Sequence, residues 1–316
     1  TTTLSDATGG GTWASSNTGI ATIGSLTGIV SGITAGTTTI TYRLGTSCNV
    51  TFAMTVNPTP VAITGTTTVC AGSTTTLSDA TAGGTWSSGA PGVATVGAST
   101  GIVSGVAAGT ANITYAIGSC IATTSVNVNP IPAAITGANT LCVGSTTALS
   151  DATPGGTWAS SNTGVASIGS LLGVVSGVTA GTATITYRLG TGCNVTFAMT
   201  VNPSPVAITG INTVCAGSTT VLSDATAGGT WSSGTTGVAT IGASTGIVTG
   251  VAAGTSSITY AIGTCIAART VSVNPVPATI TGTTTLCVGN STTLSDATAG
   301  GTWSSSNTGV ATIGSA

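Results

Sequence analysis

The chain has 316 residues, of which only 3% are charged, and its formal net charge is −2. It contains no His, Lys, Glu or Gln, so a general acid–base pair has almost no material, and three arginines cannot neutralise a nucleic-acid backbone. No stretch approaches the roughly 18 uninterrupted apolar residues of a membrane span, and we expect no enzyme, no cofactor, no nucleic-acid partner and no membrane span in this segment.

Five copies of one repeat follow one another along the chain. A tryptophan marks each copy, with steps of 73, 72, 73 and 72 residues between Trp13, Trp86, Trp158, Trp231 and Trp303. Asn-Pro pairs keep the same spacing and open proline-containing stretches that are typical of linkers. The predicted modules are a partial one at 1–57 that lacks its first strand, complete ones at 58–129, 130–202 and 203–274, and a truncated one at 275–316.

The modules alternate between two types. The sequence TYRLGTSCNVTFAMTVNP at 41–58 returns 145 residues later, at 186–203, with one change, whereas the intervening copies read TYAIG. Modules 1–57 and 130–202 are therefore of type A, and modules 58–129 and 203–274 are of type B. Because both ends of the sequence fall inside a module, we expect it to be a window on a longer repetitive chain.

Strand signals follow one another at short intervals within the module 58–129. β-Branched residues, period-two alternation and Gly, Asn, Asp and Pro turns predict seven strands, at 61–65, 73–78, 85–88, 93–96, 101–106, 109–118 and 121–128. No helical period accompanies them. The predicted fold class is all-β, a tandem array of small immunoglobulin-like β-sandwich modules of about 72–73 residues.

The order of the short motifs resembles a known family. G-S-T-x-x-L-S is followed by T-W-x-S-S, V-A-T-[VI]-G, G-[IV]-V-[ST]-G-V-x-A-G-T-x-x-I-T-Y and a closing V-x-V-N-P. This order is similar to that of the group 2 bacterial immunoglobulin-like domain of invasin- and intimin-like adhesins. Over the whole chain, the Thr/Gly-rich, Cys-containing version resembles tandem repeats of giant surface proteins of Bacteroidetes. The resemblance implies an extracellular protein, on the cell surface or secreted, that serves as a stalk, filament or adhesin.

The recurring tryptophans allow two interpretations. In the resembled fold this tryptophan lies on a core-facing strand, where burial of its ring would supply several kcal/mol to a module of small side chains. The other aromatic residues are also periodic and lie in predicted strands, which favours a core anchor. The alternative is a row of sugar-stacking platforms that bind glycans by avidity. Buried indoles would support a structural stalk, and exposed indoles would support multivalent binding.

Each copy also carries one aspartate, seven residues before its tryptophan: Asp6, Asp79, Asp151, Asp224 and Asp296. We expect the carboxylate to accept backbone N–H bonds in the turn before the third strand. Calcium would need several oxygen ligands from one loop, which a lone aspartate does not supply. The pattern therefore predicts a turn residue and no metal site.

Eight cysteines recur in phase with the modules: Cys48, Cys70, Cys120, Cys142, Cys193, Cys215, Cys265 and Cys287. An even, periodic set in a chain without His indicates disulfides and an oxidising compartment over zinc. Pairing within modules would give Cys70–Cys120, Cys142–Cys193 and Cys215–Cys265. Bonds between separate chains are a further alternative.

The immunoglobulin-like wiring favours a different pairing. It would place the two cysteines of a module at opposite ends of strands that span roughly 20–25 Å, while a disulfide tolerates at most about 7 Å between Cα atoms. End-to-end stacking then favours the junction pairs Cys70–Cys193 and Cys142–Cys265. In that scheme Cys48 and Cys120 would reach upstream, and Cys215 and Cys287 would reach downstream.

Two functional classes remain open at this point. One is an extracellular filament or stalk segment that gives length and stiffness, and the other is a set of multivalent glycan- or surface-binding adhesin modules. The sparse charge and hydroxyl-rich strand edges favour association with further copies of the repeats or chains. Glycans are a second expected partner, either bound or as O-linked sugars on exposed Thr and Ser.

Overall fold

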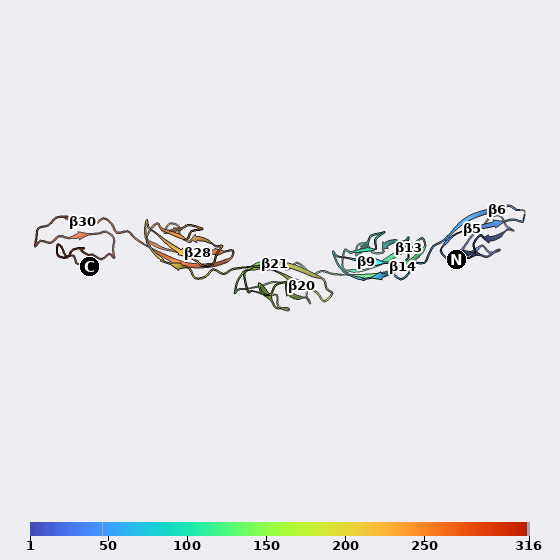
Figure 1. Ribbon diagram of the computed structural model, residues 1–316, viewed down its shortest axis with the longest axis horizontal. Helices are drawn as coiled ribbons and strands as arrows, with labels where there is room; N and C mark the ends of the chain where they lie inside the picture. Colours follow the sequence, from blue (N-terminus) through green and yellow to red (C-terminus); the bar gives the residue numbers. More distant parts are fainter. Residues whose placement is uncertain (46, 315–316) are drawn as a thin grey trace. The chain divides into compact units, whose positions relative to one another are not determined.

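A computed structural model describes residues 1–45 and 47–314. Within these ranges the regular elements are all β-strands, and no helix is long and apolar enough to cross a membrane (Figure 1). The chain divides into two compact units, one formed by Thr1–Ala133 with Arg188–Val195 and the other by Ala134–Tyr187 with Thr196–Ala316. Each unit is larger than one repeat, and the module boundaries at the Asn-Pro pairs stay a prediction.

In the first unit, residues 58–129 fold into a sandwich of two sheets. Its strands are β7 (Thr64–Gly65), β8 (Thr68–Cys70), β9 (Thr74–Ser78), β10 (Thr85–Ser88), β11 (Ala94–Val96), β12 (Ile102–Gly105), β13 (Gly109–Ile117) and β14 (Cys120–Asn129). One sheet has the order β10-β13-β14-β8 and the other β11-β12-β9-β7. Neighbouring strands are antiparallel except β8 and β14, which run parallel. This arrangement confirms the predicted immunoglobulin-like sandwich.

The core of this sandwich comes from alternation along its strands. Ala111, Ile113 and Tyr115 on β13 are buried, whereas the residues between them are exposed or half-buried. β14 contributes Val126 and Val128 in the same way. Apart from Tyr115, these side chains are small or β-branched, and they fill the narrow space between two pleated sheets.

The start of the module differs from the prediction. The strand predicted at 61–65 shortens to β7, and β8 follows it as a strand that the sequence pattern did not predict. β7 pairs with β9 in one sheet, while β8 pairs with β14 in the other, so the chain changes sheet between them. Gly65, at a φ of 120°, provides the bend that this change requires. Strands of two and three residues are too short to show alternation.

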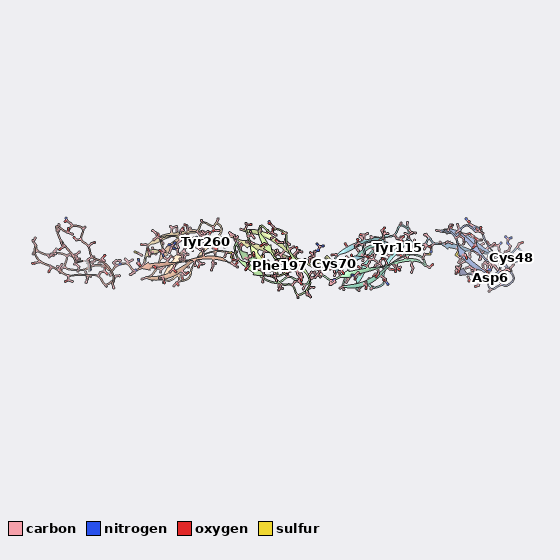
Figure 2. The ribbon with its side chains drawn as sticks, turned by 90° about the horizontal axis from the view of Figure 1, so that it is seen from below. Asp6, Cys48, Cys70, Tyr115, Phe197 and Tyr260 are labelled. Carbon is pink, nitrogen blue, oxygen red and sulfur yellow. A yellow bond between two sulfur atoms is a disulfide. The ribbon has the colours of Figure 1, made fainter. Side chains whose placement is uncertain are left out.

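Residues 1–57 of the first unit form two three-stranded sheets. Their strands are β1 (Thr2–Thr3), β2 (Thr12–Ser15), β3 (Ala21–Ile23), β4 (Ile29–Gly32), β5 (Gly36–Arg43) and β6 (Asn49–Val56), in the orders β1-β4-β3 and β2-β5-β6. No counterpart of β7 or β8 lies among the described residues of this segment. Phe52 on β6 is 52% exposed, whereas its counterpart Phe197, labelled in Figure 2, is half-buried.

The second unit contains most of residues 130–202. The strands are β15 (Thr140–Cys142), β16 (Thr146–Ala148), β17 (Thr157–Ser160), β18 (Ala166–Ile168), β19 (Val174–Gly177), β20 (Gly181–Arg188) and β21 (Asn194–Asn202). They form sheets with the orders β15-β21-β20-β17 and β16-β19-β18. The counterpart of β7 is reduced here to one bridge between Thr136 and Ser150.

Residues 203–274 of the second unit repeat the eight-stranded sandwich. Its strands are β22 (Thr209–Gly210), β23 (Thr213–Cys215), β24 (Thr219–Ser223), β25 (Thr230–Ser233), β26 (Ala239–Ile241), β27 (Ile247–Gly250), β28 (Gly254–Ile262) and β29 (Cys265–Asn274). The sheet orders are β23-β29-β28-β25 and β22-β24-β27-β26. They match the two sheets of residues 58–129 strand for strand.

The last predicted module, 275–316, extends past the last described residue. Its described part holds one strand pair, β30 (Thr281–Gly282) with β31 (Leu294–Ser295). The segment around Trp303 is not a strand, because the sequence up to residue 316 contains no counterpart of the tyrosine-bearing strand with which this segment pairs in the other copies.

Candidate functional site at the module junctions

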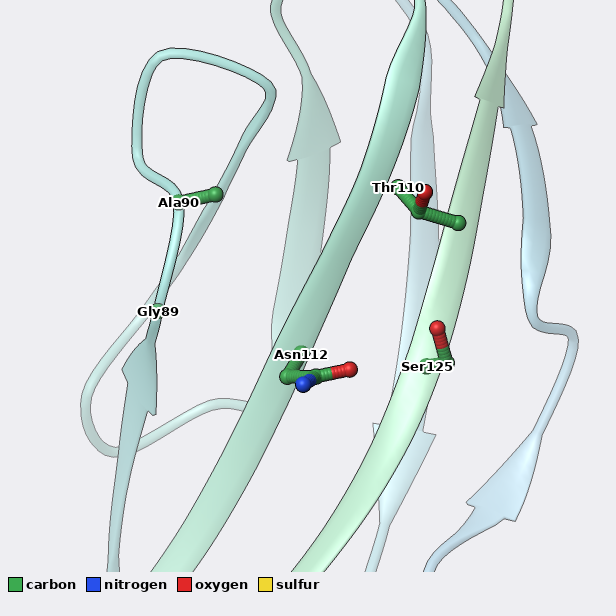
Figure 3. Close-up of a pocket in the computed structure, with 5 residues that line it drawn as sticks. All are labelled: Gly89, Ala90, Thr110, Asn112 and Ser125. Carbon is green, nitrogen blue, oxygen red and sulfur yellow. The ribbon is translucent and has the colours of Figure 1, made fainter.

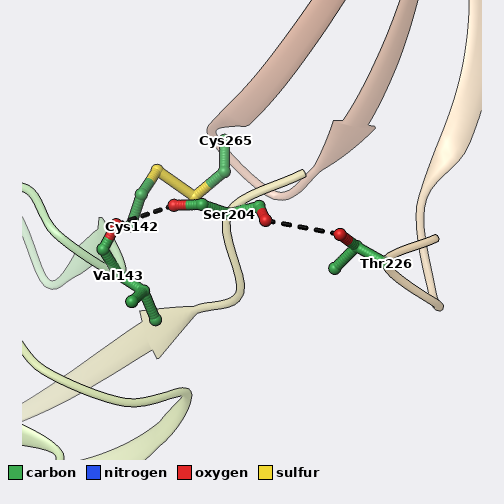
Figure 4. Close-up of a disulfide and its surroundings, with 5 residues drawn as sticks. All are labelled: Cys142, Val143, Ser204, Thr226 and Cys265. Carbon is green, nitrogen blue, oxygen red and sulfur yellow. Dashed lines mark hydrogen bonds between the residues drawn. A yellow bond between two sulfur atoms is a disulfide. The ribbon is translucent and has the colours of Figure 1, made fainter. Parts of the chain in front are cut away.

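Two disulfides join cysteines of consecutive modules. Cys70 is bonded to Cys193 and Cys142 to Cys265, with Cα–Cα distances of 5.7 and 5.6 Å and a sequence separation of 123 residues in each case (Figures 2 and 4). These are the two junction pairs that the wiring favoured, and the intramodule pairs are not formed. The remaining cysteines are free in the structure: Cys48, Cys120, Cys215 and Cys287.

Strand geometry separates the two cysteines of one module. Cys70 ends β8 opposite Asn129, the last residue of β14, whereas Cys120 is the first residue of β14. Nine residue steps along a strand cover roughly 30 Å at about 3.3 Å per residue. A disulfide cannot bridge that distance. The parallel pairing of β8 with β14 therefore directs each cysteine toward a neighbouring module.

The B-type hairpin that carries Cys265 is a tight turn. Ile262 and Cys265 pair directly across a two-residue loop, and Gly263, first in the loop, has a φ of 58°, the conformation of a type II′ hairpin. A Cβ atom on Gly263 would lie 2.6 Å from Nδ2 of Asn202, the residue that ends the preceding module. The asparagine of the Asn-Pro pair thus contacts the next module's hairpin.

The same contact recurs in the first unit. A Cβ atom on Gly118 would overlap the side-chain amide of Asn57, and the Cys120 sulfur lies 4.0 Å from the Asn57 carbonyl oxygen. The thiol of Cys120 therefore occupies the place that the bonded Cys265 has in the second unit.

The A-type hairpin that carries Cys193 is longer. The Leu189 N–H donates to the Cys193 carbonyl and the Gly192 N–H donates to the Leu189 carbonyl, both at 2.9 Å. Gly192 permits this turn through its φ of 93°. Cys193 and Cys265 are 1% and 3% exposed. Both disulfides are consequently shielded from reductants on their hairpin side.

Hydrogen bonds fix the linker beside the second disulfide (Figure 4). Ser204 Oγ donates to the Val143 carbonyl at 2.7 Å, next to Cys142. Thr226 Oγ1 donates to the Ser204 carbonyl at 3.4 Å and accepts from the Val206 N–H at 3.2 Å. The linker is therefore attached to residues on both sides of the junction.

Three of the five tryptophans lie in complete sandwich cores. Trp86, Trp158 and Trp231 are each 8% exposed. Each ring packs against the tyrosine on the neighbouring strand, at centroid distances of 4.6–4.7 Å, the tyrosines being Tyr115, Tyr187 and Tyr260. Trp13 and Trp303 are only half-buried. Trp303 lies outside a strand, and among the described residues no strand pairs with its segment, so its role as a core anchor stays a prediction.

The tyrosines clamp the aspartate turn, a contact that the sequence pattern did not predict. Tyr260 Oη donates to the Thr226 carbonyl at 2.7 Å and accepts from the Gly229 N–H at 2.8 Å. The three other tyrosines make the same two bonds. The constant spacing of 29 residues between each tryptophan and its tyrosine is the signal that indicates a fixed pair.

Comparisons with known proteins agree with this fold. Residues 122–198 match the family profile of the bacterial Ig-like domain (group 2). This stretch is a group 2 bacterial Ig-like domain. The match begins within β14 and ends within β21, and the other copies repeat the same sequence in phase.

Solved structures of a surface layer protein and of invasin are similar to the chain. Domains 1–6 of the surface layer protein SbsC share 18% identity, over 86% of this chain and 52% of that one, with a TM-score of 0.22. Invasin, a bacterial integrin-binding protein, shares 14% identity over 86% and 73% of the two chains, with a TM-score of 0.32. The chain spans about half the length of the SbsC structures it matches. A search of curated proteins finds no match.

The aspartate of each Ig-like module acts as predicted in its turn. Its Oδ1 accepts the backbone N–H two residues later, at 2.6–2.8 Å, in all five copies. In the last copy, the Thr298 backbone hydrogen bond lowers the pKa of Asp296, against the opposing effect of desolvation. Among the described residues, no three His, Cys, Asp or Glu side chains gather as metal ligands.

Shallow hollows mark the outer face of the tyrosine-bearing sheet. One of about 330 Å³ is lined by Gly89, Ala90, Thr110, Asn112 and Ser125 (Figure 3). A second, of about 320 Å³, lies on residues 1–57 and is lined by Thr12, Ala14, Ser15, Ser16, Thr41 and Arg43. Neither lining includes an aromatic ring, so these hollows offer hydroxyl and amide groups without a stacking platform.

Proposed function

We propose that this chain is a structural segment of an extracellular bacterial filament, stalk or giant surface adhesin, in which the Ig-like modules give length and stiffness. The observation that carries the proposal is the Cys142–Cys265 disulfide, which joins one module to the hairpin of the next. Such a bond limits bending at the junction, because it adds a second covalent connection beside the linker. The disulfides also support an oxidising, extracellular location.

The core chemistry supports the same role and opposes an enzymatic one. The complete modules bury their tryptophans against tyrosines. A single aspartate per module is engaged with backbone N–H groups in its turn. Neither arrangement supplies a nucleophile beside a general base. We therefore infer no catalytic activity for this segment.

Small-angle scattering tests the stiffness. The oxidised chain is compared with a variant in which both bonds are removed by C70S, C193S, C142S and C265S. The matched control is C48S/C215S, which removes two free thiols and keeps both bonds. We expect the bond-free chain to have the smaller mean radius of gyration because its junctions bend more. Indistinguishable scattering from all three proteins would refute the proposal that the disulfides stiffen the chain.

A second candidate is a multivalent glycan-binding adhesin, favoured by the hollows on the outer sheet face. Asn112 and Ser125 pair across adjacent strands there and present polar groups suited to sugar hydroxyls. Without an aromatic platform, such a site would bind weakly and depend on avidity. A glycan array probed with the chain and with N112A tests it. Binding that N112A abolishes would favour the adhesin over a purely structural segment.

Lateral association and O-linked sugars are the partners we propose for the segment. With 3% charged residues and a net charge of −2, the modules have little mutual repulsion. Analytical sedimentation of unglycosylated chain should show association that grows with concentration. A monodisperse monomer at high concentration would contradict this expectation.

A further inference from the structure

The cysteines divide the chain into segments of two alternating lengths. The intervals Cys48–Cys70, Cys120–Cys142, Cys193–Cys215 and Cys265–Cys287 each measure 22 residues, by subtraction of their numbers. The intervals between them measure 50, 51 and 50 residues. Each short interval, called a connector here, contains the last strand of a module, the Asn-Pro linker and the first strands of the next. Each long interval, called a body, carries a tryptophan and its tyrosine.

The disulfides join connectors to connectors. The bond between Cys70 and Cys193 links the end of connector 48–70 to the start of connector 193–215. The bond between Cys142 and Cys265 links the end of connector 120–142 to the start of connector 265–287. Two covalent lines result, each made of a connector, a disulfide and a second connector, and neither passes through a body.

We infer that these lines are two load-bearing covalent tracks that carry tension along the chain past the module bodies. The inference rests on the proposed structural function and deepens it, because it assigns the mechanical load to specific residues. Track one consists of 48–70 and 193–215, and track two consists of 120–142 and 265–287.

The two tracks meet as hydrogen-bonded neighbours in every complete module. β8 of track one runs parallel to β14 of track two in residues 58–129. In the next module β15 of track two is parallel to β21 of track one, and in the third β23 of track one is parallel to β29 of track two. The track that supplies the short first strand in one module therefore supplies the long last strand in the next. Force along either one is therefore shared with the other through a parallel strand ladder.

Each of the two junctions between complete modules is consequently crossed twice, once by each track. Between modules 130–202 and 203–274, track one crosses as the peptide linker and track two crosses as the Cys142–Cys265 disulfide. Between modules 58–129 and 130–202 the roles are reversed, since the linker belongs to track two and the disulfide to track one. A single break in either of these two linkers should leave the ends of the chain covalently joined.

Cleavage of a linker tests the tracks. A site for a specific protease is inserted between Ser204 and Pro205 in the full chain, and the oxidised protein is cut and run on a denaturing gel. Ser204 is exposed, which favours access of the protease. We expect one species without reductant and two with it. The same result is expected for a site inserted between Pro132 and Ala133, whereas a chain with both sites should give one species without reductant and three with it.

The matched control is the Ser204 site combined with C142S and C265S, which should separate without reductant. Intramodule pairing predicts that the wild-type cut chain also separates without reductant, and this outcome would overturn the tracks. Uncut chains in both backgrounds, compared by circular dichroism, establish that the serine variants fold.

Pulling on the cut chain tests the load directly. The cleaved, oxidised protein is held between its two ends in an optical trap, where only a disulfide can transmit force across the cut. We expect the tether to survive until reductant is added. A tether that fails in oxidising buffer overturns the load-bearing tracks and leaves the structural role to the linkers. The two proposals can also fail separately. If the tether survives but the oxidised and bond-free chains scatter identically, the stiffness proposal is overturned and the tracks stand.

Discussion

The clamp between Tyr260 and the loop before β25 gives a prediction whose size can be worked from the structure. The hydroxyl donates to the Thr226 carbonyl at 2.7 Å and accepts from the Gly229 N–H at 2.8 Å, while the ring packs 4.7 Å from the Trp231 ring. Tyr260→Phe removes both hydrogen bonds and keeps the ring. The change therefore isolates the polar part of the clamp from its apolar part.

Each lost hydrogen bond should cost about 1 kcal/mol, because water cannot fully replace the lost partner of a half-buried backbone group. The two together should lower the free energy of opening of this module by about 2 kcal/mol. Since about 1.4 kcal/mol corresponds to a factor of ten, hydrogen exchange limited by module opening should accelerate roughly 30-fold.

Hydrogen exchange followed by mass spectrometry measures this module by module. Amides of β28 and β29 should exchange faster in Y260F, while those of β13 and β14 keep their wild-type rates. Ser257→Ala, at an exposed position on β28, is the matched control and should change little. Equal rates in Y260F and S257A would refute the clamp, and acceleration that spreads equally to residues 58–129 would refute independent modules.

Three further predictions follow from single contacts. Gly263→Ala places a side chain at a φ of 58°, which should destabilise the hairpin by about 1–2 kcal/mol. Fewer Cys142–Cys265 bonds should therefore re-form after reduction and reoxidation. Titration of free thiols measures this, with Thr264→Ala as the control. The lowered pKa of Asp296 means that the ionised carboxylate stabilises its turn at pH values above the ordinary aspartate pKa, and that this stabilisation is lost as the pH falls through the pKa of the folded state. Titration of the carboxyl group by NMR should give a midpoint below that of a model peptide. Arg269→Ala removes the 2.6 Å bond from Nη1 to the Ile208 carbonyl; exchange at Thr209 and Gly210 should rise about fivefold, or about 1 kcal/mol, and unchanged exchange would contradict this.

Sequence periodicity was sufficient for the larger features of the fold. The tryptophan spacing predicted the repeats, and alternation at 109–118 predicted β13 to within a residue. Long strands with one buried face show a clear period of two, which is why they can be located without coordinates. The aspartate turn was predictable for a similar reason, since its hydrogen bonds are local.

The features that were not predicted depend on contacts far apart in sequence. β8 has three residues, and its identity as a strand comes from parallel pairing with β14, some sixty residues later. The tyrosine clamp joins residues 31 and 34 positions apart. The contact of Asn202 with Gly263 likewise connects two modules. Local periodicity contains no information about such partners.

The junction cysteines lie between these two cases. Their spacing favoured disulfides, but only the wiring of the strands separates Cys70 from Cys120 and directs it to Cys193. Trp303 shows the limit of the same reasoning. Its sequence context matches the other tryptophans, yet it lies outside a strand, and no strand up to residue 314 pairs with its segment.

Mass-spectrometric mapping of disulfide-linked peptides from the unreduced protein tests the central claim most directly. The protein is alkylated before digestion so that free thiols cannot exchange with the bonds. The account predicts that Cys70 is linked to Cys193 and Cys142 to Cys265 as the main species. Main species that link Cys70 to Cys120 and Cys142 to Cys193 would contradict it, because every module would then be closed on itself and no disulfide would cross a junction.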